Sequence, residues 1–199
     1  MPLPEYIFTY GSLVNSLSRG GRETCWRVIL SRVYGYECGW YVPVPEDQST
    51  GLGIVKKESA VINGILLDIT DDKKLLLDKR EIQHGYIRRR IPEKFVNLLS
   101  GDSLHKSIVW SYVVDSREKP SNECPITQSY LDVVLSGYLE IGEDYAVEFI
   151  KNTKCWDSIW INDRLSPRYR RHLKSDFIKI DRLLCSTIPD EFIKRIEIR

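Results

Sequence analysis

The chain has 199 residues, of which 42% are hydrophobic and 29% are charged, and its formal net charge is +1. This length and composition are those of a globular protein with a real core, and they exclude extensive disorder. The near-neutral charge provides no overall field for nucleic acid or an anionic membrane, so we expect neither as a partner.

The five cysteines are scattered along the chain, and no two of them form a Cys-x-x-Cys pair. An odd number at irregular spacing indicates neither a disulfide framework nor a structural zinc site. The N-terminus lacks the charged and apolar regions of a signal peptide, and no apolar run approaches the roughly 20 residues that span a bilayer. We therefore expect a cytoplasmic protein with reduced thiols.

The first part of the chain is rich in β-forming segments. Residues 6–10 are aromatic and β-branched and stop at Gly11, which predicts a strand that runs into a turn. Residues 28–44 predict one or two strands with a bend, because two glycines and a proline interrupt them. Residues 60–69 predict a further strand.

A short helix is predicted next. Thr70 has the side chain of an N-cap, and the two aspartates that follow it suit the positive end of a helix dipole. The helix should end near Glu81, before a His-Gly pair. Residues 86–91 then predict a strand on which two isoleucines share one face, and residues 107–114 predict another.

After Pro120 the pattern changes to helical spacing. Apolar residues recur through 126–141 at intervals that predict a helix, and residues 143–156 continue in the same way. Residues 190–196 predict a short last helix. A β-rich body followed by helical material predicts an α+β protein.

Three segments, in this order, carry a resemblance to a known family. They are FTYGSL at residues 8–13, LDKRE followed by HGY within residues 77–86, and PITQSY at residues 125–130. Together they resemble the γ-glutamylcyclotransferase-like family, whose members open with a strand that ends in Tyr-Gly-Ser. Members also carry a catalytic Glu shortly before a later strand, and a helix after the barrel with an inward Tyr.

The resemblance implies a single domain over residues 1–199. Its fold would be a small mixed β-barrel at about residues 5–118 with flanking helices, and a helical C-terminal part at about residues 120–199 would pack on it. The resemblance also implies a cofactor-independent γ-glutamylcyclotransferase that acts on a small-molecule γ-glutamyl substrate, without a metal.

The implied reaction needs particular residue types. Family members let the α-amine of the substrate attack the substrate's own γ-glutamyl carbonyl, which releases 5-oxoproline and a free amine, amino acid or peptide. Well-placed intramolecular reactions reach effective molarities of about 10⁵–10⁸ M, so the protein needs no nucleophile of its own. The resemblance implies Glu81 as the general acid/base for the two proton transfers.

Opposing effects would act on Glu81. Burial beside an apolar substrate stem would raise its pKa, whereas Lys79 and Arg80 would lower it if they pointed inward. The sequence leaves open which effect is larger. His84 lies close by, but the family does not require a histidine there.

The Tyr10-Gly11-Ser12-Leu13 turn is implied as the substrate cradle. Gly11 permits a backbone conformation that aims successive N–H groups into one concavity, and such a nest binds an anion. The anion would be the α-carboxylate or the developing oxyanion. Tyr10 and Tyr130 would wall the pocket and offer their hydroxyls to the substrate.

Alternatives to this hypothesis remain. A γ-glutamylamine cyclotransferase would act on isopeptide-type adducts, and the leaving-group pocket would decide between the two enzymes. A non-catalytic binding module would use the basic residues within 164–174 to hold a partner such as nucleic acid, although a solvated or ion-paired surface is the simpler interpretation. The oligomeric state also stays open, with a homodimer as one option.

Overall fold

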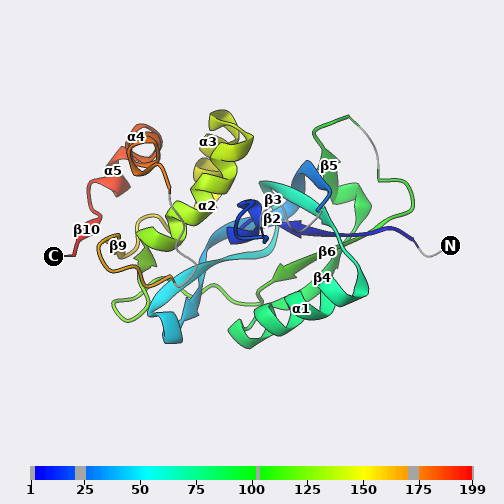
Figure 1. Ribbon diagram of the computed structural model, residues 1–199, viewed down its shortest axis with the longest axis horizontal. Coiled ribbons are helices and arrows are strands. Elements are labelled where there is room, and N and C mark those ends of the chain that lie inside the picture. Colours follow the sequence, from blue (N-terminus) through cyan, green and yellow to red (C-terminus); the bar gives the residue numbers. More distant parts are fainter. Residues whose placement is uncertain (1–2, 21–25, 102–103, 170–174, 199) are drawn as a thin grey trace.

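The computed structural model describes residues 3–20, 26–101, 104–169 and 175–198. Within them, seven strands form one sheet in the order β4-β6-β1-β3-β2-β5, and β8 joins this sheet at β2. The strands are β1 (Glu5–Thr9), β2 (Val28–Val44), β3 (Ser49–Asp68), β4 (Ile87–Ile91), β5 (Val96–Leu98), β6 (Ile108–Val113) and β8 (Thr153–Lys154). The sheet is mixed, because β1 is antiparallel to β3 and parallel to β6. This curled sheet with helices around it confirms the predicted α+β class (Figure 1).

The strands β2 and β3 form one long hairpin, closed by the single 3-10 turn η3 (Pro45–Asp47). Two register shifts interrupt their pairing, one at Gly35 and one at Tyr41. Bulges of this kind bend and twist a strand, so residues 28–44 are one bent strand and not two. The strand predicted at 60–69 already begins at Ser49, because glycines in its first half hide its β pattern.

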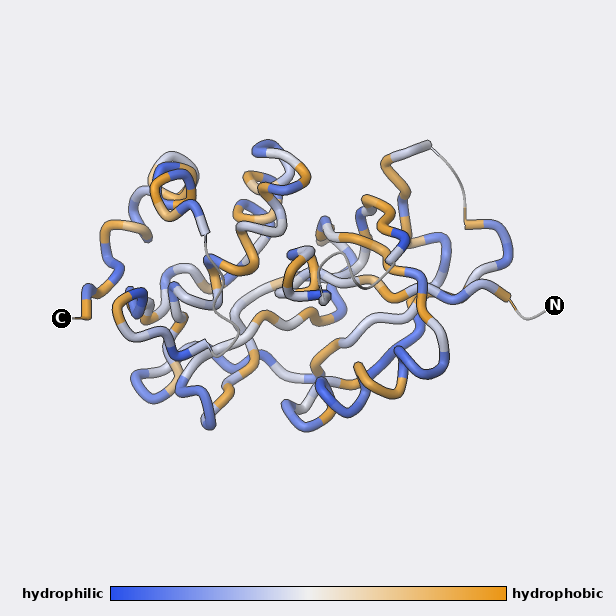
Figure 2. Tube along the Cα trace, in the orientation of Figure 1, coloured by the Kyte–Doolittle hydropathy of each residue, from blue (hydrophilic) through white to orange (hydrophobic). Residues whose placement is uncertain are grey.

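The predicted helix forms as α1 (Asp71–Glu81), and the side chain of Thr70 caps it by accepting a hydrogen bond from the Lys73 amide at 3.4 Å. The helix continues into the 3-10 turn η4 (Ile82–His84), and Gly85 then reverses the chain into β4 with a φ of +82°. Glycine adopts such a φ at little cost. Glu81 is therefore held at a helix end, directly before a tight turn. Figure 2 shows α1, along the lower edge, as mainly hydrophilic.

The strand β6 confirms the prediction at 107–114, and β4 confirms the one at 86–91. Between them lies the short turn η5 (Glu93–Phe95), which leads into β5.

The helices α2 (Gln128–Ile141) and α3 (Glu143–Asn152) lie above the long hairpin in Figure 1, and α1 lies below it. α2 packs directly on η1 (Ser12–Val14), the turn that follows β1. A Cβ atom added at Gly137 would lie 2.3 Å from the backbone nitrogen of Asn15, which is far inside a normal contact. Gly137 thus allows the helix backbone to touch the backbone of the turn.

The sequence predicts a purely helical C-terminal part, but the structure differs. A second, parallel sheet in the order β10-β9-β7 joins its segments. Its elements are β7 (Ile126–Thr127), β9 (Trp160–Asn162), α4 (Phe177–Thr187), α5 (Pro189–Phe192) and β10 (Ile196–Glu197). Two predicted helices are also shorter than expected. α3 stops at Asn152 because residues 153–154 pair with β2, and the last predicted helix stops at Phe192, before β10.

One hydrophobic core extends through the sheet and the C-terminal elements, from Ile7 to Leu184. Its largest fully buried side chains include Trp40, Tyr138 and Trp160. None of the helices in the described part of the chain is both long and apolar enough to cross a bilayer.

Candidate active site

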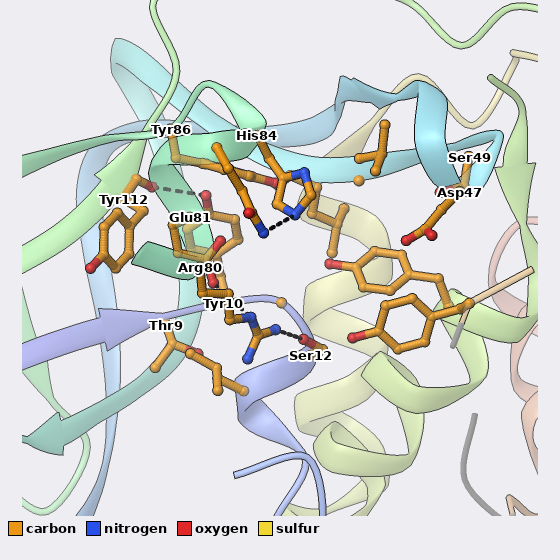
Figure 3. A pocket seen from close by; sticks show the side chains of 18 of the residues that line it. Thr9, Tyr10, Ser12, Asp47, Ser49, Arg80, Glu81, His84, Tyr86 and Tyr112 are labelled. Carbon is orange, nitrogen blue, oxygen red and sulfur yellow. Dashed lines mark hydrogen bonds and ion pairs between the residues drawn. The ribbon is translucent and has the colours of Figure 1, made fainter. Parts of the chain in front are cut away.

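A cavity of about 550 Å³ brings together segments that are far apart in the chain. The turn after β1, the hairpin turn at η3, the end of α1 with η4, and the first turn of α2 form its walls (Figure 3). All six residues that the sequence singled out line this cavity: Tyr10, Gly11, Ser12, Leu13, Glu81 and Tyr130.

Glu81 is the last residue of α1, and its side chain is 15% exposed. Its Oε1 atom forms an ion pair with the Nε atom of Arg80 at 3.1 Å. The helix end and the Gly85 turn fix the backbone on both sides, so the carboxylate has a defined place in the cavity wall. This is the arrangement that a residue acting on protons in a bound substrate requires.

Tyrosines surround the Glu81 carboxylate. The pKa values of four of them lie well above the ordinary value for tyrosine: Tyr10, Tyr86, Tyr112 and Tyr130. Burial of the hydroxyl is the largest cause in each case, and the negative charge of Glu81 adds to it in all four. These hydroxyls therefore stay protonated near neutral pH. Those of Tyr86 and Tyr112 donate hydrogen bonds within the protein, to the backbone oxygen of Leu52 and to the carboxylate of Asp78.

The structure gives a different reason for the glycine at position 11 from the one that the sequence suggests. Gly11 has a φ of −103°, outside the left-handed region, so its backbone conformation does not explain the glycine. Space explains it, because an added Cβ would lie 3.0 Å from the hydroxyl oxygen of Tyr130. The amides of Ser12 and Leu13 lie at the start of η1, and the first amides of a helix have no acceptor within that helix.

Tyr10 also differs from the expectation. Its hydroxyl donates a hydrogen bond to the backbone oxygen of Tyr112 at 2.9 Å, so its proton already has an acceptor within the protein. Tyr10 lines the cavity as a wall, and its hydroxyl is not offered to a substrate as a donor.

Arg80 also lines the cavity, although the sequence indicates it only as a neighbour of Glu81. Its side chain is 23% exposed and lines the cavity. Its Nη2 atom donates a hydrogen bond to the Ser12 hydroxyl at 2.9 Å (Figure 3). One guanidinium thus touches both the acid and the turn that was expected to cradle the substrate. Only its position beside Glu81 in the sequence hinted at this role.

No family model matches the sequence, and no curated protein matches it. A solved structure described as a γ-glutamyl cyclotransferase superposes with a TM-score of 0.60 at 14% identity, over 88% of this chain and 95% of that chain. The chain has the γ-glutamyl cyclotransferase fold.

Two further solved structures share the γ-glutamyl cyclotransferase fold with this chain. An uncharacterized protein from Homo sapiens has a TM-score of 0.57 at 15% identity, over 72% of this chain and 87% of that chain. YkqA from Bacillus subtilis has a TM-score of 0.54 at 17% identity, over 76% of this chain and 56% of that chain. At these identities the likeness concerns the fold.

The hairpin turn at η3 forms one wall of the cavity, and this wall carries Glu46 and Asp47. The Nδ1 atom of His84 lies 2.8 Å from a carboxylate oxygen of Glu46, which links η4 to η3. The sequence does not single out Glu46 or Asp47, because no local pattern indicates that the hairpin turn reaches η4.

The C-terminal part of the fold supplies Tyr169, whose ring packs edge-on against Tyr130 with centroids 4.9 Å apart. Of the basic residues around it, Arg164 points into the protein and not into solvent. The side chain of Arg164 is 11% exposed and forms ion pairs with Asp132 and Asp181, each at 2.8 Å. Three other basic residues of this segment lie outside the described residues: Arg170, Arg171 and Lys174.

Proposed function

We propose that this protein is a γ-glutamylcyclotransferase with Glu81 as its general acid/base. The observation that carries the proposal is that Glu81 and the Gly11 turn line the same cavity in a chain with this fold. A residue that only ends a surface helix would have no reason to face that turn.

The reaction is an intramolecular exchange of one amide for another. The substrate α-amine forms a bond to the γ-carbonyl carbon, and the bond from that carbon to the departing nitrogen breaks. Glu81 accepts a proton from the attacking amine and returns it to the departing amine, so the products are 5-oxoproline and a free amine. The site would contribute by holding the substrate folded, with its amine next to its γ-carbonyl, because an intramolecular reaction is fast only in such a geometry.

The turn and Arg80 would hold the negative charges of the substrate. The amides of Ser12 and Leu13 would donate hydrogen bonds to the α-carboxylate or to the oxyanion that develops on the γ-carbonyl. The guanidinium of Arg80, which already touches Ser12 and Glu81, adds a positive charge on the same side of the cavity.

Release of 5-oxoproline from a panel of γ-glutamyl compounds tests the proposal. The panel contains a γ-glutamyl dipeptide, glutathione and a γ-glutamyl diamine. Glu81→Gln keeps the shape of the side chain and deletes the titrating group, so we expect it to lower kcat by about 10²–10⁴-fold. Asp72→Asn, a change of the same kind on the exposed side of the same helix, is the matched control. Full activity of Glu81→Gln would remove Glu81 from the mechanism.

The same panel tests the narrower alternative of a γ-glutamylamine cyclotransferase. The carboxylates of Glu46 and Asp47 line the cavity at the hairpin turn. Negative charge there favours a leaving group that carries a positive charge, as a diamine does. A diamine conjugate that reacts no faster than a dipeptide would speak against this alternative.

A further inference from the structure

A buried carboxylate, Asp163, fastens the segment that follows β9 to the start of α2. Asp163 is 2% exposed. It accepts hydrogen bonds from the Ser129 amide at 2.7 Å, the Ser129 hydroxyl at 2.6 Å and the Arg168 amide at 2.8 Å. Hydrogen bonds to a charged acceptor are among the stronger ones in proteins, and a buried acceptor is costly to leave unsatisfied. Segment 163–169 is therefore held in one place.

This attachment places Tyr169 in the cavity wall. The Tyr169 amide donates to the Ser129 hydroxyl at 3.2 Å, so the two ends of the segment meet at one serine. The Tyr169 ring then packs on Tyr130, the neighbour of that serine, and both rings line the cavity. The side chain of Arg168 reaches the other way and donates to the backbone oxygen of Gln48 at 2.8 Å.

Tyr169 and the hairpin turn thus form one wall, joined through Arg168, while Arg80 and Glu81 lie against Ser12. A γ-glutamyl group bound at Glu81 and at the turn after β1 fills the region of the cavity next to Arg80, Glu81 and Ser12. The leaving group, which extends beyond the amide, must then occupy the rest of the cavity. The wall that it meets there includes Tyr169.

We propose that Tyr169 determines leaving-group specificity by contacting the leaving group, and that Asp163 is the positioning residue that holds Tyr169 in place. This rests on the proposed function of the cavity. The catalytic acid and the residue that selects the leaving group then come from different parts of the chain. Glu81 lies before β4, and Tyr169 lies after β9.

A series of substrates with one γ-glutamyl group and different leaving groups tests the proposal. The leaving groups are methylamine, alanine and phenylalanine, in order of size. Tyr169→Ala should lower kcat/KM for the phenylalanine compound about tenfold more than it lowers kcat/KM for the methylamide. Tyr169→Phe keeps the ring, so the ratio between these two compounds should stay that of wild type. An equal change for all three compounds in Tyr169→Ala would overturn the proposal.

Asp163→Asn tests the positioning role. It removes part of the acceptor capacity for Ser129 and Arg168, so it should change the phenylalanine-to-methylamide ratio in the same direction as Tyr169→Ala. Asp181→Asn is the matched control, because Asp181 belongs to the same C-terminal part and pairs with Arg164 but does not line the cavity. A ratio that shifts equally in both variants would mean general loosening and would overturn the role of Asp163.

A footprint that does not depend on turnover completes the test. In a Tyr169→Cys, Glu81→Gln variant, iodoacetamide modification at position 169 is followed by mass spectrometry of the peptide. The phenylalanine compound should slow modification at that position by about tenfold, whereas 5-oxoproline, which lacks a leaving group, should not. Equal rates with both ligands bound would overturn the proposal. Absence of 5-oxoproline from wild-type protein with every substrate would instead overturn the proposed function, and the inference with it.

Discussion

The Nε atom of Arg80 lies 3.1 Å from Oε1 of Glu81, and the Nη2 atom of the same guanidinium donates to the Ser12 hydroxyl at 2.9 Å. The helix end and the turn after β1 are therefore connected through one cation. This connection gives the first test of the proposed chemistry that does not alter the acid itself.

Arg80→Met should lower kcat/KM by about tenfold or more, because it removes the cation that contacts both Glu81 and Ser12. The control is Lys79→Met, which removes the same charge from an exposed position. If the two variants lose the same activity, the contacts of Arg80 do not contribute to the reaction.

Gly11→Ala should reduce activity about tenfold or more while the protein stays folded, because the added methyl group meets the Tyr130 hydroxyl at 3.0 Å. Tyr130→Phe removes the oxygen atom that is in the way. The double variant should therefore recover part of the activity lost in Gly11→Ala. Gly142→Ala, at a glycine with no neighbouring atom within 4 Å, serves as the control. No recovery in the double variant would disprove this explanation of the glycine.

Gly137→Ala should lower the free energy of unfolding by about 1–3 kcal/mol, as overpacking does. Alanine favours a helix over glycine by about 1 kcal/mol, but here the methyl group would meet backbone atoms of Val14 and Asn15, which cannot rotate away. Urea unfolding measures the change. A variant as stable as wild type would show that α2 and the turn can separate without cost.

Arg164→Met should lower the free energy of unfolding by about 3–5 kcal/mol, because Asp132 is fully buried and would lose its main counter-ion. Neutralising the stranded carboxylate as well, in Arg164→Met with Asp132→Asn, should restore part of this loss. Urea unfolding of the variants provides the measurement. A loss below about 1 kcal/mol would mean that Arg164 behaves as a surface residue after all.

The stabilising effect of Asp181 should depend on pH. Burial alone would raise its pKa, but hydrogen bonds and charge from Arg164 and Arg195 outweigh burial and hold the pKa below its ordinary value. A lowered pKa in the folded state means that the stabilisation is complete above the unfolded pKa of about 4 and is lost as the pH falls further. The stability difference between wild type and Asp181→Asn should thus be constant between pH 6 and 8 and shrink toward pH 3. A difference that grows on acidification would contradict this sign.

The elements whose signals are local could be predicted from the sequence. Thr70 with its two aspartates specified α1, and the segment from Tyr6 to Gly11 specified the first strand and turn. The three segments that resemble the cyclotransferase family also indicated which residues would meet. Those residues line one cavity. A sequence cannot give the orientation of a side chain, so Arg80 as a cavity residue and the committed hydroxyl of Tyr10 were missed.

The C-terminal part could not be predicted in the same way. Its strands are two or three residues long, too short to show a period, and they form only because distant segments pair. Arg164 belongs to a basic run in sequence, whereas the acids that pair with it, Asp132 and Asp181, lie elsewhere in the chain. Long-range pairing of this kind leaves no trace in a window of neighbouring residues.

The close contact between Gly137 and the backbone of Asn15 has a thermodynamic consequence. The turn cannot shift without displacing α2, so a molecule that rigidifies the turn also rigidifies the helix. Ligand occupancy and resistance to heat are then linked. Protection from hydrogen exchange of the α2 amides around Gly137, outside the residues that line the cavity, would therefore report on ligand binding.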